Sequence, residues 1–401
     1  MKSGGEMRRV EEVVVKIAGG YGVDIQKTTY SLTNCLMVSY DDDDSDLHIS
    51  KVRQIPGACS VRMDILEEVN QLSRDIQCGR YPTVSDAKKK LNEIAGKKES
   101  NLFATTMLSG IVAVAFAFLL GGGAREIIPV FAGGALSVLL SRTVGKHVPR
   151  MFDMFLAGLV IGLVAFLSGF ISQTVFSVTL NVEKIMAGAI MPLVPGYSFT
   201  SGFRDFGNTD YLSGLVRLVD AFVVLICMAS GAVAVSVFMA LFKVRIAFAA
   251  PVLTVDGLWF STLMAFIGSM CFGYLMQIPV KHLIWSGLCG VVTWVVFAVT
   301  EEPLTYAGAM LLSTAVLMFV VRILSSALQC PTTVFLSGGI IVVVPGALLF
   351  FAVFYAATMN MSLAGPMALK ALITCGGIML GIAIMNAIPQ KFFGMFKPRS
   401  K

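Results

Sequence analysis

The residues best placed to do chemistry in this chain belong to two Val-Pro-Gly triplets, 194–196 and 344–346, which lie 150 positions apart in long apolar segments. Proline removes a backbone hydrogen bond from a helix, and glycine tolerates the bend that results. In lipid, the freed backbone groups need protein or water as partners. A repeated break therefore predicts a polar site inside a membrane, whereas a simple packing kink is the alternative interpretation.

Hydroxyl-bearing side chains follow the first triplet directly. Broken helices form the substrate site of many transporters that are built from repeats. We therefore predict a small-molecule site around the two breaks, and its candidate residues are Pro195, Gly196, Tyr197, Ser198, Thr200, Pro345 and Gly346.

A charged cluster follows the first break and contains Asp205, Arg217 and Asp220. Arg217 and Asp220 are three residues apart, so on a helix they would share a face and could pair. Ionisable groups within a membrane segment are costly and are candidates for function by default. We predict that these three residues couple transport to protons or form a gate. Alternatively, residues 221–242 span the membrane alone, and Arg217 and Asp220 lie at the interface with their charged ends in water.

The sequence offers no set of metal ligands and no cofactor motif. Its eight cysteines include no C-x-x-C pair and no Cys/His group at ligand spacing, so we predict neither a metal nor a disulfide. No G-x-x-x-x-G-K-S/T loop is present, so ATP-driven pumping has no support. His282 lies at a predicted loop–helix boundary and is interpreted as interfacial, and Glu183-Lys184 is interpreted as a pair of loop residues.

The composition identifies an integral membrane protein. Hydrophobic residues make up 56% of the chain, and charged residues only 14%. Soluble domains are nearer 25% charged. The net charge of +6 does not indicate nucleic-acid binding, because much of the basic charge lies in short loops and at the C-terminus, where it sets topology. The lipid bilayer is therefore the expected surroundings of most of the chain.

Residues 1–100 differ from the rest and predict a small α+β domain. Helical periodicity covers 6–21, 60–78 and 84–94, and strand patterns cover 28–40 and 47–55, with the acidic run Asp41–Asp46 as a hairpin tip. From Asn101 onward, uncharged runs long enough to cross a bilayer predict ten helices. We place them near 102–122, 126–144, 153–176, 184–203, 212–242, 256–277, 282–300, 303–324, 332–358 and 365–389.

The membrane part shows an internal repeat with an offset of 150. The pair Pro129-Val130 aligns with Pro279-Val280, and the Val-Pro-Gly triplets align with each other, without any gap. Five helices in each copy put the second copy into the membrane from the opposite side, as in secondary transporters. The predicted domains are therefore 1–100, 101–250 and 251–401, in a mainly α membrane protein with two inverted five-helix repeats.

The distribution of Lys and Arg over the loops predicts the orientation. With residues 1–100 inside, the inner side collects most of the basic residues, in accord with the positive-inside rule. Only the loop with Lys243 and Arg245 argues against this assignment. Both termini are expected in the cytoplasm.

The sequence resembles the threonine/serine exporter family over essentially its whole length. The opening helix carries Arg9-Val10-Glu11-Glu12, the first membrane block carries Val-Pro-Gly followed by Asp205 and residues 214–221, and the second block repeats Val-Pro-Gly. The resemblance implies a multi-pass antiporter of the inner membrane that exports threonine and serine by alternating access, driven by protons. It is not an enzyme family. Backbone groups at the two breaks would then hold the ammonium and carboxylate of the amino acid, and a homo-oligomer stays open.

Two other functions compete with this one. An exporter of dicarboxylates such as succinate would need cations at the cavity, and Arg204 and Arg217 are the candidates. A membrane enzyme would need a nucleophile and a base in residues 1–100, where His48 with Ser45 or Ser50 stands without any motif.

Overall fold

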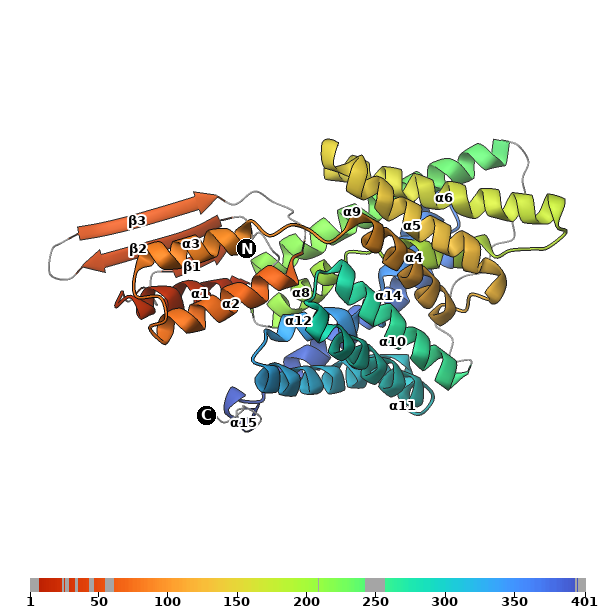
Figure 1. Ribbon diagram of the computed structural model, residues 1–401. Helices are drawn as coiled ribbons and strands as arrows, with labels where there is room; N and C mark the ends of the chain where they lie inside the picture. Colours follow the sequence, from red (N-terminus) through yellow and green to blue (C-terminus); the bar gives the residue numbers. More distant parts are fainter. Residues whose placement is uncertain are drawn as a thin grey trace.

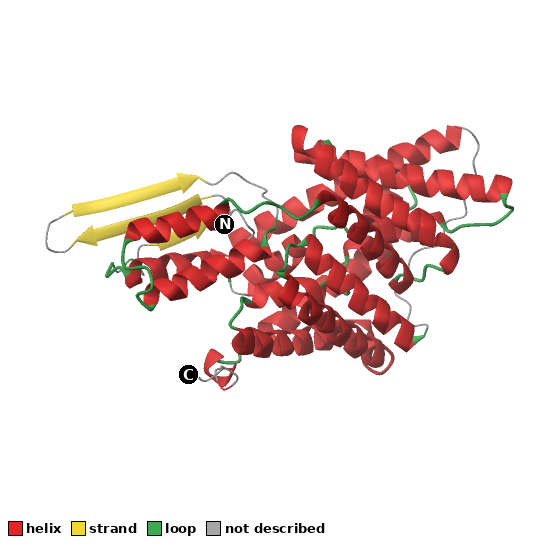
Figure 2. Ribbon diagram, viewed as in Figure 1, coloured by secondary structure: helices red, strands yellow, loops and turns green. Residues whose placement is uncertain are grey.

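The structure is a computed structural model that describes residues 7–23, 25, 29–32, 35–42, 47–54, 61–207, 209–241, 257–393 and 395. Helices make up most of it, and a small sheet stands at one end (Figure 2). Figure 1 shows that α1 and the last helix, α15, lie toward this same end.

The N-terminal elements are three helices and one antiparallel sheet of order β1-β2-β3. Their bounds are α1 Met7–Gly20, β1 Thr29–Leu32, β2 Cys35–Asp42, β3 Leu47–Gln54, α2 Met63–Gln77 and α3 Val84–Ala95. The single strand predicted over 28–40 is wrong, because β1 folds back on β2 with Leu32 opposite Cys35. Polar and apolar residues alternate in the same way before and after a tight turn, so the alternation does not show where one strand ends and the next begins. Residues 43–46 of the predicted acidic tip lie outside the described residues.

A small core of its own holds these helices together. Leu72 and Ile76 of α2 pack against Ala87 and Ile94 of α3, and all four are buried. The hydroxyl of Tyr21, just after α1, donates to the carbonyls of Tyr81 and Thr83 before α3. These contacts connect α1, α2 and α3.

The rest of the described chain is helical. Its first half contains α4 Leu102–Leu119, α5 Ile127–Thr143, α6 Arg150–Val175, α7 Val182–Ile190, α8 Gly196–Gly207 and α9 Tyr211–Leu241, with the short turns η1 Ala124–Glu126 and η2 Gly145–His147. Its second half contains α10 Leu258–Leu275, α11 Val280–Leu328, α12 Thr332–Ile340, α13 Gly346–Ala357, α14 Met361–Asn386 and α15 Gln390–Phe393. Seven helical segments of the described chain are long and apolar enough to cross a membrane.

Two of the predicted helices are each broken into two. The segment 184–203 corresponds to α7 and α8, separated at residues 191–195, and 332–358 corresponds to α12 and α13, separated at 341–345. Each break ends at the proline of a Val-Pro-Gly triplet, which cannot donate the next helical hydrogen bond. The break predicted from the triplets is present in both halves.

The two helices predicted over 282–300 and 303–324 form the single element α11, which has a sharp internal kink. Thr305 adopts φ 69° and ψ 159°, far from helical values, two residues after Pro303. The expected division therefore lies at Thr305, and α11 contains two helical segments of different direction.

Glycines allow the closest helix contacts. A Cβ atom added at Gly158 of α6 would lie 1.9 Å from the carbonyl oxygen of Met228 in α9, and one at Gly231 would lie 2.1 Å from that of Phe155. The same kind of contact joins α14 to α11, where Gly381 meets the backbone of Leu311. Small residues that bring helix backbones together are the usual interface of membrane helices.

Replacing Gly158 by alanine is expected to destabilise the fold. The added methyl meets backbone that cannot rotate away, so overpacking should cost about 1–3 kcal/mol or more. Thermal unfolding of the purified protein measures this cost. Gly376→Ala in α14 is the matched control, because nothing lies within 4 Å of its Cβ position, and it should be neutral or stabilising. Equal unfolding temperatures for both variants would contradict the close α6–α9 contact.

Candidate functional site

The two helix breaks cross each other at the centre of the helical part. A Cβ atom at Gly196 would lie 2.5 Å from Cδ1 of Ile341, and one at Gly346 would lie 2.2 Å from Cγ1 of Val194. All four residues are buried. Each break is thus covered by the break of the other half, and the absence of a side chain at each glycine makes the approach possible.

The backbone at the breaks is partly committed to local hydrogen bonds. The amide of Gly196 donates to the carbonyl of Val194 at 2.7 Å, and that of Gly346 donates to Val344 at 2.8 Å. The first amides of any helix lack partners within that helix, and the N-terminus carries partial positive charge. The start of α13 can therefore attract an anion, although the Gly346 amide itself is engaged.

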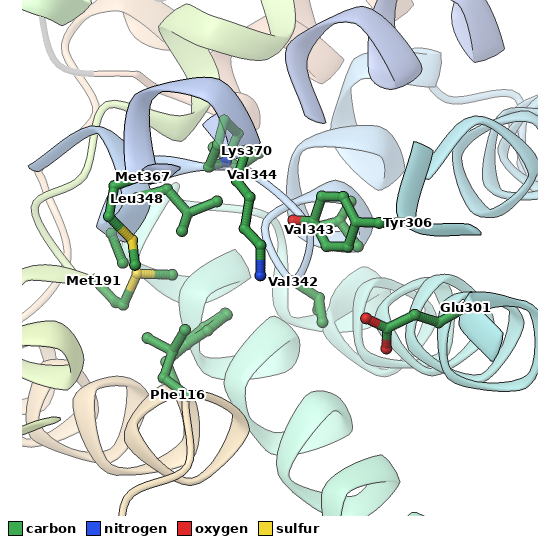
Figure 3. A pocket seen from close by; sticks show the side chains of 13 residues that line it. Phe116, Met191, Glu301, Tyr306, Val342, Val343, Val344, Leu348, Met367 and Lys370 are labelled. Carbon is green, nitrogen blue, oxygen red and sulfur yellow. The ribbon is translucent and has the colours of Figure 1, made fainter. Parts of the chain in front are cut away.

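A cavity adjoins the second break (Figure 3). Its empty volume is about 660 Å³, its open mouth included. The walls come from α4, α11, the second break, α13 and α14, with Met191 from the first break. The lining residues are Phe116, Leu120, Met191, Glu301, Tyr306, Val342, Val343, Val344, Pro345, Ala347, Leu348, Met367 and Lys370.

Two side chains of opposite charge belong to this mostly apolar wall. Figure 3 shows Lys370 reaching into the cavity and the carboxylate of Glu301 facing it from α11. The Nζ atom of Lys370 lies 5.6 Å from the ring centre of Tyr306, whose hydroxyl is 3.0 Å from Oγ1 of Thr374. A carboxylate, an ammonium and a phenol thus line one cavity.

The predicted binding residues are distributed unequally around this cavity. Pro345 lines it, and Gly346 begins α13 next to it. Gly196, Tyr197 and Thr200 are buried in α8, where the Thr200 hydroxyl donates to the carbonyl of Gly196 at 2.8 Å. Pro195 and Ser198 are half-buried. None of the five candidates from the first break belongs to the lining of this cavity. The first break contributes Met191 to the lining instead.

The charged cluster forms two separate ion pairs. Nε of Arg217 lies 3.1 Å from Oδ2 of Asp205, and these side chains are only 13% and 5% exposed. Asp220 instead pairs with Arg150, the first residue of α6, at 2.9 Å, with both side chains about half exposed. Arg217 and Asp220 do share a helix, but each has its partner on another element. Nη2 of Arg204 donates to Oγ1 of Thr332 at the start of α12.

The two aspartates should respond very differently to mutation. Asp205→Asn removes the charge partner of a buried arginine, so we expect a loss of about 3–5 kcal/mol in stability. Asp220→Asn breaks an exposed pair and should cost about 1 kcal/mol or less. Thermal unfolding of both purified variants, side by side, measures the difference. Similar unfolding temperatures would show that Asp205 does not stabilise Arg217.

The interpretation of Glu183 as a loop residue is wrong. It lies in the first turn of α7 and is fully buried, and the hydroxyl of Tyr355 in α13 donates to its Oε1 atom. The reason is that α7 packs against α4, α5 and α6 from its first turn, so Glu183 is buried where the helix begins. Lys184 next to it donates to the carbonyl of Gly121. The start of α7 and the end of α13 are thereby connected, at the opposite end of the crossing from Arg204 and Thr332.

Sequence reasoning also missed Lys370, although a signal was present. Lys370 is the one charged residue between Arg322 and Lys391. A single charge in so long an apolar stretch marks a functional candidate in a membrane protein. Glu301 and Tyr306 carried no such signal, because only the kink at Thr305 brings them to the cavity.

Among the residues considered for a membrane enzyme, His48 and Ser50 lie in β3. Ser50 in β3 accepts a hydrogen bond from the hydroxyl of Ser39 in β2, and Ser45 lies outside the described residues. His48 stands opposite Asp41 in the strand register. These contacts are those of neighbouring strands in an antiparallel sheet.

Comparison with protein families matches two parts of the chain separately, and each part contains one of the two helix breaks. A family model described as a threonine/serine exporter matches residues 1–239, and a second, described as threonine/serine exporter ThrE, matches residues 261–388. No curated protein and no solved structure matches the chain. Together the two matches cover nearly the whole chain in two modules, as in the fused form of two-module exporters. The chain therefore belongs to the threonine/serine exporter family, which is a family of membrane transporters.

Proposed function

We propose that this protein is a secondary exporter of small hydroxy amino acids, threonine and serine, and that the cavity beside the second break is its substrate site. The observation that carries the proposal is the pair of opposite charges on the cavity wall, Lys370 and Glu301. A free amino acid at neutral pH is a zwitterion, so a site for it needs one partner of each sign.

A binding mode follows from these positions. The substrate carboxylate meets Lys370 and the positive N-terminal end of α13, and the ammonium meets Glu301. Tyr306 supplies a hydroxyl that can bond the side-chain hydroxyl of threonine or serine. The carboxylate is thus expected near the second break, as predicted, with Lys370 added to the backbone groups.

Dicarboxylate export is the second candidate, and the cavity favours it less. A dicarboxylate would place one of its two anionic groups near Glu301. The cations first considered for that substrate do not line the cavity: Arg217 pairs with Asp205, and Arg204 bonds Thr332. Like charges at close range cost affinity in a low-dielectric site.

We also propose ten spans in two inverted five-helix repeats, 101–250 and 251–401, behind a domain of residues 1–100. The seven candidate spans count α11 once and include neither broken helix. Counting α11 as two spans, and adding α7 with α8 and α12 with α13 as one span each, gives ten. The reciprocal contacts, Gly196 with Val344 and Gly346 with Val194, support a two-fold relation between the halves. The inner membrane is proposed from the resemblance to the exporter family, and the cytoplasmic position of both termini from the basic loops.

Proton coupling is proposed to involve the ionisable groups at the two ends of the crossed helices. Asp205 with Arg217, and Asp220 with Arg150, lie toward the end where α2 packs, and form a gate there. Glu183 with Tyr355 lies at the opposite end. In alternating access, the end with the two ion pairs and the end with Glu183 open in turn, while the crossed breaks stay in place between them.

Binding and transport by the purified protein test this function. Labelled threonine should bind saturably, and unlabelled serine should compete, whereas succinate and valine should compete much less. In proteoliposomes, a pH gradient should drive threonine accumulation above its equilibrium level. Saturable succinate binding without threonine binding would overturn the proposal in favour of the dicarboxylate exporter.

A further inference from the structure

Three side chains that can bind metals meet where the N-terminal elements touch the helical part. Glu67 comes from α2, His282 from the start of α11, and Cys330 from the turn between α11 and α12. The distance from Nε2 of His282 is 3.3 Å to Oε1 of Glu67 and 3.1 Å to Sγ of Cys330. All three residues are buried, and 215 positions separate the first from the second.

We propose that these residues bind one divalent transition-metal ion, with Zn²⁺ as the ion that fits best. A thiolate, an imidazole and a carboxylate are the three ligand types that zinc takes in proteins. Bond lengths of about 2.0–2.3 Å at tetrahedral angles put ligand atoms roughly 3.3–3.6 Å apart. The two separations from Nε2 of His282 are at or slightly below this range, and all three ligand atoms lie within 4.8 Å of one another.

The hydrogen-bonding capacity of the cluster supports a cation. Nε2 of His282 has either one proton or one lone pair, yet it faces two electron-rich atoms, Oε1 and Sγ. In addition, Oε2 of Glu67 is buried without a hydrogen-bond partner among the described residues. Glu67 is 8% exposed and His282 5%. Unpaired polar atoms at this depth are costly, and a cation with a bound water provides partners for such a group.

The neighbours of the cluster are compatible with this role. Nζ of Lys281 lies 2.6 Å from Oε1 of Glu67 and balances part of its charge. The ring of Phe335 packs edge-on against His282 and shields it from water. On binding, the Cys330 thiol loses its proton to solvent and the thiolate becomes a ligand, so metal uptake is coupled to proton release. Three protein ligands leave one position for water.

The bound ion would fasten the N-terminal elements to the second membrane half. Other contacts already join them: the amides of Met63 and Asp64 donate to the carbonyls of Met276 and Gln277, and Arg74 donates to that of Gln329. The metal adds a strong link in the middle of this interface. It therefore fixes α2 relative to the starts of α11 and α12, and α12 leads into the second break.

Metal content of the full-length protein tests the proposal. The protein is purified in detergent with a tag that contains no histidine, equilibrated with Zn²⁺ and dialysed, and its zinc is measured by mass spectrometry. We expect about one zinc per chain, and at least a tenfold reduction in Cys330→Ala and His282→Ala. Cys78→Ala is the matched control, because this exposed cysteine follows the same α2 helix. After replacement by Co²⁺, a thiolate–cobalt absorption band should appear in the parent protein and in Cys78→Ala.

Each outcome decides the matter independently of export activity. If Cys330→Ala fails to fold, as judged by gel filtration, Glu67→Gln and the cobalt spectrum of the parent protein replace it. A parent protein without zinc after equilibration, or without a thiolate–cobalt band, overturns the site. Equal zinc in folded Cys330→Ala and in the parent protein overturns it as well. The proposed transport function survives these failures, because the cavity with Lys370 shares no residue with the cluster.

Discussion

Threonine binding by a Lys370→Met variant is expected to fall by roughly 10- to 150-fold. Methionine fills similar space but lacks the ammonium group, so the substrate carboxylate loses its charged partner in the cavity. Hydrogen bonds to charged groups contribute about 1.5–3 kcal/mol, which corresponds to this range in affinity. Labelled-threonine binding to the purified variant gives the number, and efflux from vesicles should decline in parallel.

Two controls separate a lost contact from a lost fold. Lys370→Arg retains the charge and should keep part of the binding. Lys88→Met removes a lysine from the exposed surface of α3 and should bind like the parent protein. The fold of Lys370→Met should not suffer, since removing a charge from the apolar helix α14 lowers the cost of inserting that helix into the membrane. Parent-like binding by folded Lys370→Met would exclude the cavity as the threonine site.

A Glu183→Gln variant should lose proton-driven export while continuing to exchange threonine. The carbonyl oxygen of glutamine can still accept the hydrogen bond from Tyr355, so the end of α13 stays attached to α7. Glutamine cannot take up or release a proton, however. Since Glu183 is fully buried, its carboxylate is well placed to hold a proton out of contact with bulk water. We expect at least a tenfold drop in accumulation driven by a pH gradient.

Proteoliposomes distinguish these two activities. Accumulation against a gradient is measured with and without a pH difference, and threonine–threonine exchange is measured without one. Glu302→Gln removes an exposed carboxylate of α11 and serves as control. If Glu183→Gln accumulates threonine as the parent protein does, proton coupling must be assigned elsewhere, and Asp205 is the next residue to test.

The positions of the helix breaks were predictable because their cause is local. Proline lacks a backbone donor wherever it stands, so both Val-Pro-Gly triplets had to interrupt a helix. The membrane character was equally predictable, since apolar runs of sufficient length have few other uses. The third strand of the sheet was not, because a tight turn leaves the alternating pattern on either side unchanged.

The partners of the buried ionisable residues depend on distant packing and were largely hidden. Arg217 lies three residues from Asp220 in sequence, yet it pairs with Asp205, because α8 packs beside α9. Glu183 looked like a loop residue by its neighbours, but it is buried because α7 packs against α4, α5 and α6. The cluster of Glu67, His282 and Cys330 illustrates the same limit, since the distances that matter join three separate elements.

The crossed breaks have a consequence for biogenesis. The half-helices α7, α8, α12 and α13 contain 9 to 12 residues each, and none spans a bilayer of about 30 Å alone. When the ribosome has released only the first half, its break still lacks the cover that Ile341 and Val344 later provide. Until the second half arrives, the first half is therefore an incompletely packed intermediate in the lipid. A single polypeptide shortens that interval, since the tether keeps the second half at high local concentration until the two breaks meet.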